Sequence, residues 1–196
     1  MELWIYLGGA LFLIALIFIF GRSAGGGGIP RDSEVRSMIE SALLSRRSGD
    51  LPQAEMQYER ALSLLDKSGE PDQALLCCTL KGMAEILERN GKFVQAKAHR
   101  DRLVEIWNRA LSQKQDDFLI EIDFMCLDSE FGASTKEVAD YYERVLAYRE
   151  KTTPPTSTVF NNTIVIYSRL LRRLGENEIA DQLEEHAKKL QEGSSS

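Results

Sequence analysis

The sequence has few of the residues and motifs on which enzymes depend. Among its 196 residues there are two histidines, His99 and His186. It contains no paired-histidine motif, no glycine-rich phosphate-binding loop and no nucleophile elbow. The glycine run at 25–28 is no phosphate loop, because no strand is expected before it and no lysine and serine follow at the required spacing. We therefore expect a protein that is not an enzyme and that has no cofactor or metal.

Cysteine is also scarce, and its positions suit neither zinc nor redox chemistry. Cys77, Cys78 and Cys126 are odd in number, two are adjacent, and none has the spacing of a metal-binding or redox pair. We interpret them as small core residues in a reducing compartment.

Runs of β-branched residues are few outside the first twenty positions, which favours an all-α fold.

A basic surface is missing too. Residues 32–196, which come after Glu2, Arg22 and Arg31, carry 22 basic and 29 acidic side chains, a net charge of about −7. Such a surface repels a phosphate backbone, so nucleic acid is not expected as a partner.

The most informative feature present is a spacing. Gly49, Gly91, Ala133 and Gly175 lie 42 residues apart. Residues at fixed offsets from them are small or medium-sized: Ala54, Ala96, Val138 and Ala180 five residues later, and Ala42, Ala84, Cys126 and Ser168 seven residues earlier. Antiparallel helices approach closely only where side chains are short. A period of this length therefore predicts stacked helical hairpins.

Two stretches of sequence connect this period to a known family. Residues 49–54 read GDLPQA and are followed by Tyr58 and Ala61-Leu62, while residues 91–96 read GKFVQA. This pattern resembles the tetratricopeptide repeat (TPR), in the longer form found in the kinesin light chain, since 42 residues exceed the standard 34. The resemblance covers residues 34–191. The proline that usually closes the second helix is missing, and Asp66, Asn108, Glu150 and Glu192 occupy those positions.

The resemblance implies a right-handed superhelical solenoid of about four helix-turn-helix repeats that binds a protein or peptide in a concave groove. The second helices should be about two turns longer than in the standard repeat, because no proline ends them. The third repeat is the weakest match, because Ala133 replaces the glycine. We expect eight helices, at about 34–48, 51–67, 71–90, 93–112, 115–131, 134–151, 157–174 and 177–191.

The start of the chain is apolar. Leu3 to Phe20 include no charged residue, and a helix of this length spans roughly 27 Å, close to the thickness of a hydrocarbon core. The segment predicts a transmembrane anchor at 1–22, with a buried core helix or a cleaved secretory signal as alternatives. Arg22, Arg31 and Arg36 follow it, so the positive-inside rule predicts a single-pass membrane protein with its amino terminus outside and its repeats in the cytoplasm.

Further along, residues 23–33 are expected to be a flexible linker because they include four consecutive glycines. The repeat domain would occupy residues 34–191, and residues 192–196 would form a disordered tail.

The groove of this family is lined mainly by the first helix of each repeat. Carrying the repeat register across, the resemblance assigns to it Arg36, Ile39, Leu43, Arg46, Cys78, Lys81, Glu85, Glu88, Ile120, Asp123, Leu127, Glu130, Asn162, Val165, Arg169 and Arg172. Because arginine forks suit carboxylates, we expect an extended peptide with acidic groups near Arg46 or near Arg169 and Arg172. The alternative is a solvated face whose arginines make helix ion pairs. The Lys and Asn pattern with which some members of the family hold a terminal carboxylate is not reproduced.

Two classes of function follow. The favoured one is a membrane-anchored adaptor or scaffold that binds protein partners or peptides and recruits or helps assemble them at a membrane. The other is a non-catalytic structural or assembly subunit of a membrane complex. A weaker third possibility keeps the repeats outside the cytosol. The sequence leaves the partner and the oligomeric state open.

Overall fold

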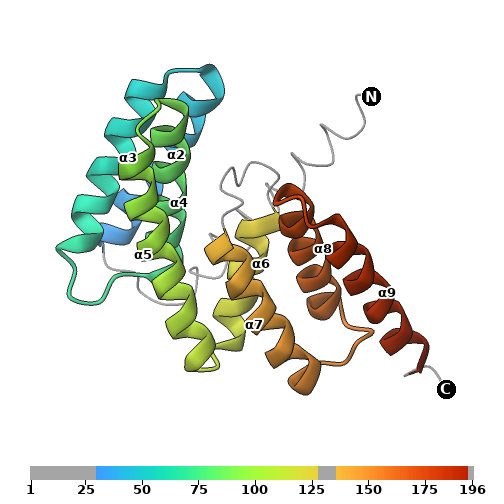
Figure 1. Ribbon diagram of the computed structural model, residues 1–196. Coiled ribbons are helices and arrows are strands. Elements are labelled where there is room, and N and C mark those ends of the chain that lie inside the picture. The colour runs from blue at the N-terminus through green and yellow to red at the C-terminus, as the bar shows by residue number, and fades with distance from the viewer. Residues whose placement is uncertain (1–29, 128–135, 194–196) are drawn as a thin grey trace. The chain divides into compact units, whose positions relative to one another are not determined.

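The computed structural model of the protein describes residues 30–127 and 136–193, and these ranges contain eight helices and no strand. The helices are α2 (Pro30–Ser48), α3 (Leu51–Asp66), α4 (Gln73–Arg89), α5 (Phe93–Ser112), α6 (Asp116–Leu127), α7 (Lys136–Thr152), α8 (Thr158–Arg173) and α9 (Asn177–Gly193) (Figure 1). The prediction of an all-α protein is therefore confirmed for the described part of the chain.

The helix boundaries lie close to those expected, and the differences have local causes. Helix α4 begins at Gln73 rather than at 71, because the side chain of Asp72 caps it by accepting a hydrogen bond from the backbone N–H of Leu75 at 3.0 Å. Helix α2 begins earlier than expected, at Pro30. Proline suits a first helical position, since the missing N–H would have no partner within the helix. Residues 30–33 of the expected linker are thus helical.

Three of the four predicted turn positions close their helices in the same way. Gly49, Gly91 and Gly175 have φ angles of +84°, +72° and +85°, a backbone conformation that favours glycine. In each case the residue after the glycine donates its N–H to the carbonyl five residues earlier, at 2.8–2.9 Å. The same backbone structure thus recurs where the 42-residue period predicts it. Ala133, the fourth position, lies outside the described residues.

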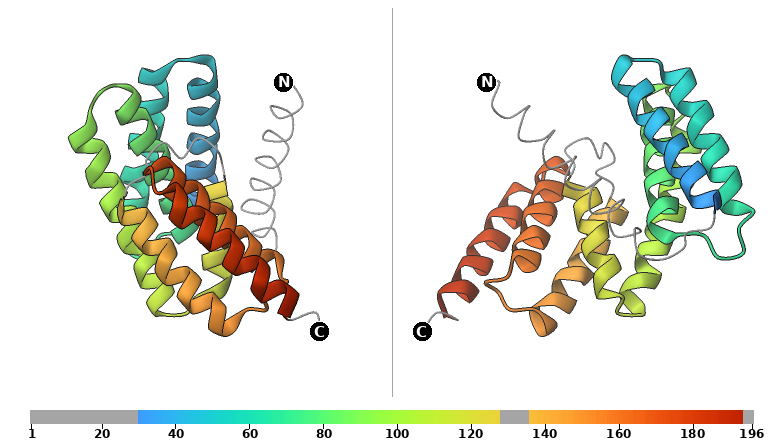
Figure 2. Two further views of the ribbon diagram at one scale, coloured as in Figure 1. Left: turned by 45° about the vertical axis from the view of Figure 1, so that its right-hand side comes forward. Right: turned by 180° about the vertical axis from the view of Figure 1, so that it is seen from behind.

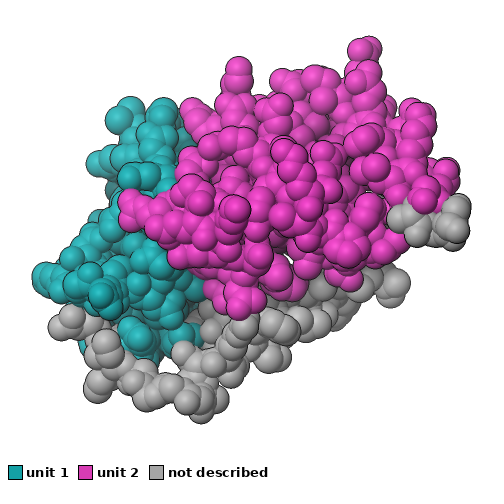
Figure 3. Space-filling model, turned by 90° about the horizontal axis from the view of Figure 1, so that it is seen from below, with its two compact units in different colours: residues 1–106 teal, residues 107–196 magenta. Residues whose placement is uncertain are grey.

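The chain divides into two compact units, residues 1–106 and 107–196, and the division falls within α5 (Figure 3). In the first unit α2, α3 and α4 pack on one another. Tyr58 of α3 is fully buried and lies against Gly82 of α4, where an added Cβ would overlap the tyrosine ring. A glycine inside a helix is unfavourable on its own, so this close approach explains why position 82 has no side chain.

In the second unit α8 contacts α6, α7 and α9, and Figure 2 shows α8 and α9 side by side. Trp107, Tyr141 and Tyr142 form an aromatic group whose ring centroids are 5.4 and 5.3 Å apart. A separate group of buried apolar side chains joins α8 to α7 and α9 and includes Phe160, Ile164, Leu171, Ala180 and Leu183. Burial of these side chains holds the last three helices together.

The prediction of a single-pass membrane protein is corrected by the structure. Within residues 30–127 and 136–193, no helix is both long enough and apolar enough to cross a membrane. The physical reason is that each of the described helices contains at least three charged residues, which a hydrocarbon core does not accommodate. The apolar segment at 3–20 on which the prediction rested lies outside the described residues, as does most of the predicted linker.

Candidate functional site

One polar contact between second helices recurs at the interval of the repeat. The second helices of the repeats are α3, α5, α7 and α9. An acidic or amide side chain near the end of one of them contacts a basic side chain in the middle of the next. The three pairs are Asp66 with Arg102, Asn108 with Arg144 at 2.6 Å, and Glu150 with His186 at 3.1 Å. Both members of each pair lie 42 residues after those of the pair before, and each pair lies within one unit. We call these three pairs the ladder.

One side of the ladder stands out in the sequence, although the contact itself was not predicted. Asp66, Asn108 and Glu150 stand where the family has its closing proline, and they were noted only because they allow longer helices. The lengthened helices in fact place these side chains where the next second helix can reach them. The signal that could have revealed the contact is the matching period of Arg102 and Arg144.

In the first unit, the charged residues expected to line a groove are paired within the unit. Arg46 and Glu85 are buried and form an ion pair, and Lys81 approaches Glu85 at 3.1 Å. Arg36 reaches Asp72 at 3.5 Å, and Glu88 pairs with Arg100. Because Arg46 and Glu85 are buried against each other, their clearest role is to join α2 to α4.

The apolar residues assigned to the groove of the first unit are partly or fully covered. Ile39 is buried, while Leu43 and Cys78 are half-buried.

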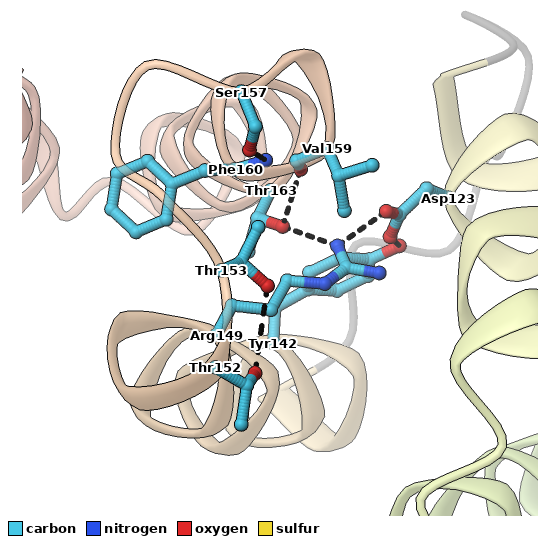
Figure 4. A network of polar contacts seen from close by, with 9 residues as sticks. All are labelled: Asp123, Tyr142, Arg149, Thr152, Thr153, Ser157, Val159, Phe160 and Thr163. Carbon is cyan, nitrogen blue, oxygen red and sulfur yellow. Dashed lines mark hydrogen bonds and ion pairs between the residues drawn. The ribbon is translucent and has the colours of Figure 1, made fainter.

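In the second unit, a buried polar network joins three helices (Figure 4). Asp123 of α6 accepts hydrogen bonds from Arg149 of α7 and from the hydroxyl of Tyr142, the latter at 3.2 Å. Arg149 also donates to Thr163 of α8, whose hydroxyl donates to the carbonyl of Val159 at 3.1 Å. Asp123, Arg149 and Thr163 are each at most 2% exposed. We call Asp123, Tyr142, Arg149 and Thr163 the buried network.

Asp123 was predicted as a groove residue, and the sequence prediction did not include its partner, Arg149. Arg149 stands 42 residues after Trp107 and 84 after Leu65, both of them buried apolar side chains. An arginine in an otherwise apolar register position is the signal that could have been used, because a buried cation requires a carboxylate nearby.

The buried network predicts a pH dependence of stability. Burial raises the pKa of the Asp123 carboxyl from its ordinary 3.8 to about 6, although the ion pair with Arg149 opposes the shift. Because the folded-state pKa lies above the unfolded one, Asp123 should reduce stability increasingly as pH rises from about 4 to about 6, by on the order of 3 kcal/mol in all. Urea denaturation of the wild type and of Asp123→Asn at several pH values measures this. The free energy of unfolding of the wild type minus that of the variant should fall over this range; a rise would contradict the prediction.

The other residues assigned to the groove of the second unit include an accessible set on α8. Asn162, Val165, Arg169 and Arg172 follow one another at intervals of three or four residues, so they share one face of the helix. Asn162 is half-buried, Val165 is 41% exposed, and both arginines are exposed. We call these four residues the α8 stripe. Ile120 is half-buried on α6, and the side chains of Leu127 and Glu130 lie outside what the structure describes.

One member of the stripe already binds carboxylates. The guanidinium of Arg172 donates to Glu184 at 2.6 Å and to Asp181 at 2.8 Å, both on α9. The hydrogen bond that Arg172 donates to Glu184 raises the pKa of Arg172, and the same bond lowers the pKa of Glu184. The two carboxylates occupy the arginine fork, so an acidic ligand at this end of the stripe would have to compete with them.

Comparison with known proteins yields a structural likeness of low score. No protein-family model and no curated protein sequence matches the chain. Among solved structures, the crystal structure of BtubC (BKLC) from P. vanneervenii is 16% identical, and the match covers 86% of this chain and 94% of that chain at a TM-score of 0.31. A likeness of this size carries no argument about function.

Proposed function

We propose that the protein is a non-catalytic interaction scaffold, built as a TPR-like solenoid, that binds other proteins or peptides. The observation that carries this proposal is the ladder, because contacts that recur at one interval are the mark of a stacked repeat array. Arrays of helical hairpins present extended surfaces, and their common use is to bind other proteins. The described residues also include no group of histidine, cysteine and acidic side chains that could hold a metal ion.

The α8 stripe is the binding site that we assign to this scaffold. It combines an exposed apolar side chain, Val165, with the exposed cation of Arg169, and Asn162 can hydrogen bond to a peptide backbone. An extended segment with an apolar residue near an acidic one fits this chemistry. Asp181 and Glu184 already contact Arg172, so an acidic residue of the ligand would compete with them there.

Crosslinking followed by pull-down of the full chain tests the function. The variant Arg169→Glu/Arg172→Glu should lose most of the partners that the wild type captures. The control Arg173→Glu/Lys188→Glu changes the charge by the same amount at two other exposed positions of α8 and α9, and it should keep them. Equal partner sets for both variants would remove the α8 stripe as the site, and the absence of any specific partner of the wild type would contradict the scaffold itself.

The stoichiometry of the captured complex separates two forms of the proposal. Several partners at varying ratios would indicate an adaptor. A single partner at a fixed ratio would indicate a structural subunit of one complex.

A further inference from the structure

The largest apolar exposure in the described part of the chain lies at the start of α5. Phe93 is 65% exposed and its neighbour Val94 is 86% exposed. The other exposed large apolar side chains described, Leu44, Val165 and Ile179, are each isolated along the sequence. Single exposed apolar residues are ordinary, whereas here two neighbours on the first turn of α5 are both exposed.

The repeat itself provides a comparison that shows this pair to be unnecessary for folding. The corresponding residues of the third and fourth repeats are polar, Thr135-Lys136 and Asn177-Glu178. In the first repeat they are Leu51-Pro52, and there the leucine is half-buried. Packing of the repeat therefore does not require Phe93 and Val94 to be apolar, and in this structure they pack into no core.

The charge around the pair is mainly positive. Arg89, Lys92 and Lys97 lie within a few residues of it and are exposed, whereas the acidic Glu88 is half-buried, and the first turn of α5 contains no acidic residue. Lys92 forms an ion pair with Glu55 at 2.6 Å, but the lysine side chain is 46% exposed and the glutamate only 15%, so the positive end faces the solvent. Lys97 is paired with Asp101 at 2.7 Å, and both of these side chains are exposed.

We propose that Phe93 and Val94, with Arg89, Lys92 and Lys97 around them, form a second docking surface for a partner segment that carries apolar side chains between acidic ones. Apolar side chains of the partner would cover Phe93 and Val94, since an aromatic residue at the centre of a contact typically carries much of its binding energy. Acidic residues of the partner would face the surrounding cations, which sets the preferred charge and the rate of association. This surface rests on the proposed scaffold function, and it lies in a different unit from the α8 stripe.

Two sets of fluorescent twelve-residue peptides serve as probes, each with leucine or phenylalanine at two central positions. One set has glutamate at the flanking positions and the other has lysine. Fluorescence anisotropy with the full chain should show binding of the glutamate set and at least tenfold weaker binding of the lysine set. The variant Phe93→Ser/Val94→Ser should bind the glutamate set at least tenfold more weakly than the wild type, with an unchanged melting temperature because both side chains are exposed.

The matched control is Ile179→Ser, which removes an exposed apolar side chain near the start of another second helix and should leave binding unchanged. Equal binding of the glutamate peptides to Phe93→Ser/Val94→Ser and to the wild type would overturn the proposal, as would preference for the lysine set or binding of neither set. In each of these cases a pull-down that depends on Arg169 and Arg172 would still support the scaffold. Failure of the scaffold proposal is thus distinguishable from failure of the docking surface.

Discussion

Replacing Arg149 with methionine is expected to lower the free energy of unfolding by about 3–5 kcal/mol at pH 7. The change removes the cation that faces the buried carboxylate of Asp123 and one hydrogen bond to Thr163. It leaves Asp123 nearly enclosed with only the hydroxyl of Tyr142 as a described partner of its side chain. Urea denaturation followed by circular dichroism measures the loss. The loss should be smaller at pH 5, because an unpaired buried carboxyl readily takes up a proton.

The control for this prediction removes both charges. Asp123→Leu/Arg149→Met replaces the ion pair with apolar side chains of similar size, and such exchanges are often nearly neutral. We therefore expect the double variant to recover most of the stability that Arg149→Met loses. A double variant whose loss equals the sum of the two single losses would show that the two side chains do not act as a pair.

Gly82→Ala is expected to destabilise the first unit although alanine is the better helix former. The added methyl group would overlap the ring of Tyr58, which is fully buried between α3 and α4. Such overpacking costs about 1–3 kcal/mol, whereas the gain in helix preference is about 1 kcal/mol. We expect a net loss of up to about 2 kcal/mol in the free energy of unfolding, measured by urea denaturation.

Making the same Gly82→Ala change in a Tyr58→Leu chain separates the overlap with the tyrosine ring from other effects. In Tyr58→Leu the ring is gone, so the Gly82→Ala change should become neutral or slightly stabilising. Gly69→Ala is the matched surface control, because a Cβ added at Gly69 meets no atom within 4 Å. If Gly82→Ala costs the same with and without the Tyr58 ring, the close approach is not the reason for the glycine.

Much of the fold could be predicted because local and repeating signals agree. Gly49, Gly91 and Gly175 mark turns whose backbone conformation favours glycine, and Asp50 caps α3 by accepting a hydrogen bond from Gln53. The small residues Ala54 and Ala96 repeat at 42 residues and are buried as expected. Signals of this kind depend on a few neighbouring residues, which is why they can be read without coordinates.

The site was predicted less well, because burial of a charged residue depends on partners far along the chain. Arg46 and Asp123 were assigned to a concave groove, and in the structure they are buried against residues 39 and 26 positions away. A pattern along one helix cannot show this. The orientation of Arg169 and Arg172 toward solvent could be predicted, but the two carboxylates bound to Arg172 come from α9.

The central claim is that one hairpin recurs at 42 residues, and distances across the ladder test it most directly. Spin labels would be placed in pairs at 66 and 102, 108 and 144, and 150 and 186, in a chain whose Cys77, Cys78 and Cys126 are replaced with alanine. Dipolar broadening in continuous-wave electron paramagnetic resonance spectra, which suits labels this close together, should then give three narrow distance distributions that coincide. Distributions that differ from pair to pair, or a broad one at any pair, would contradict the repeat.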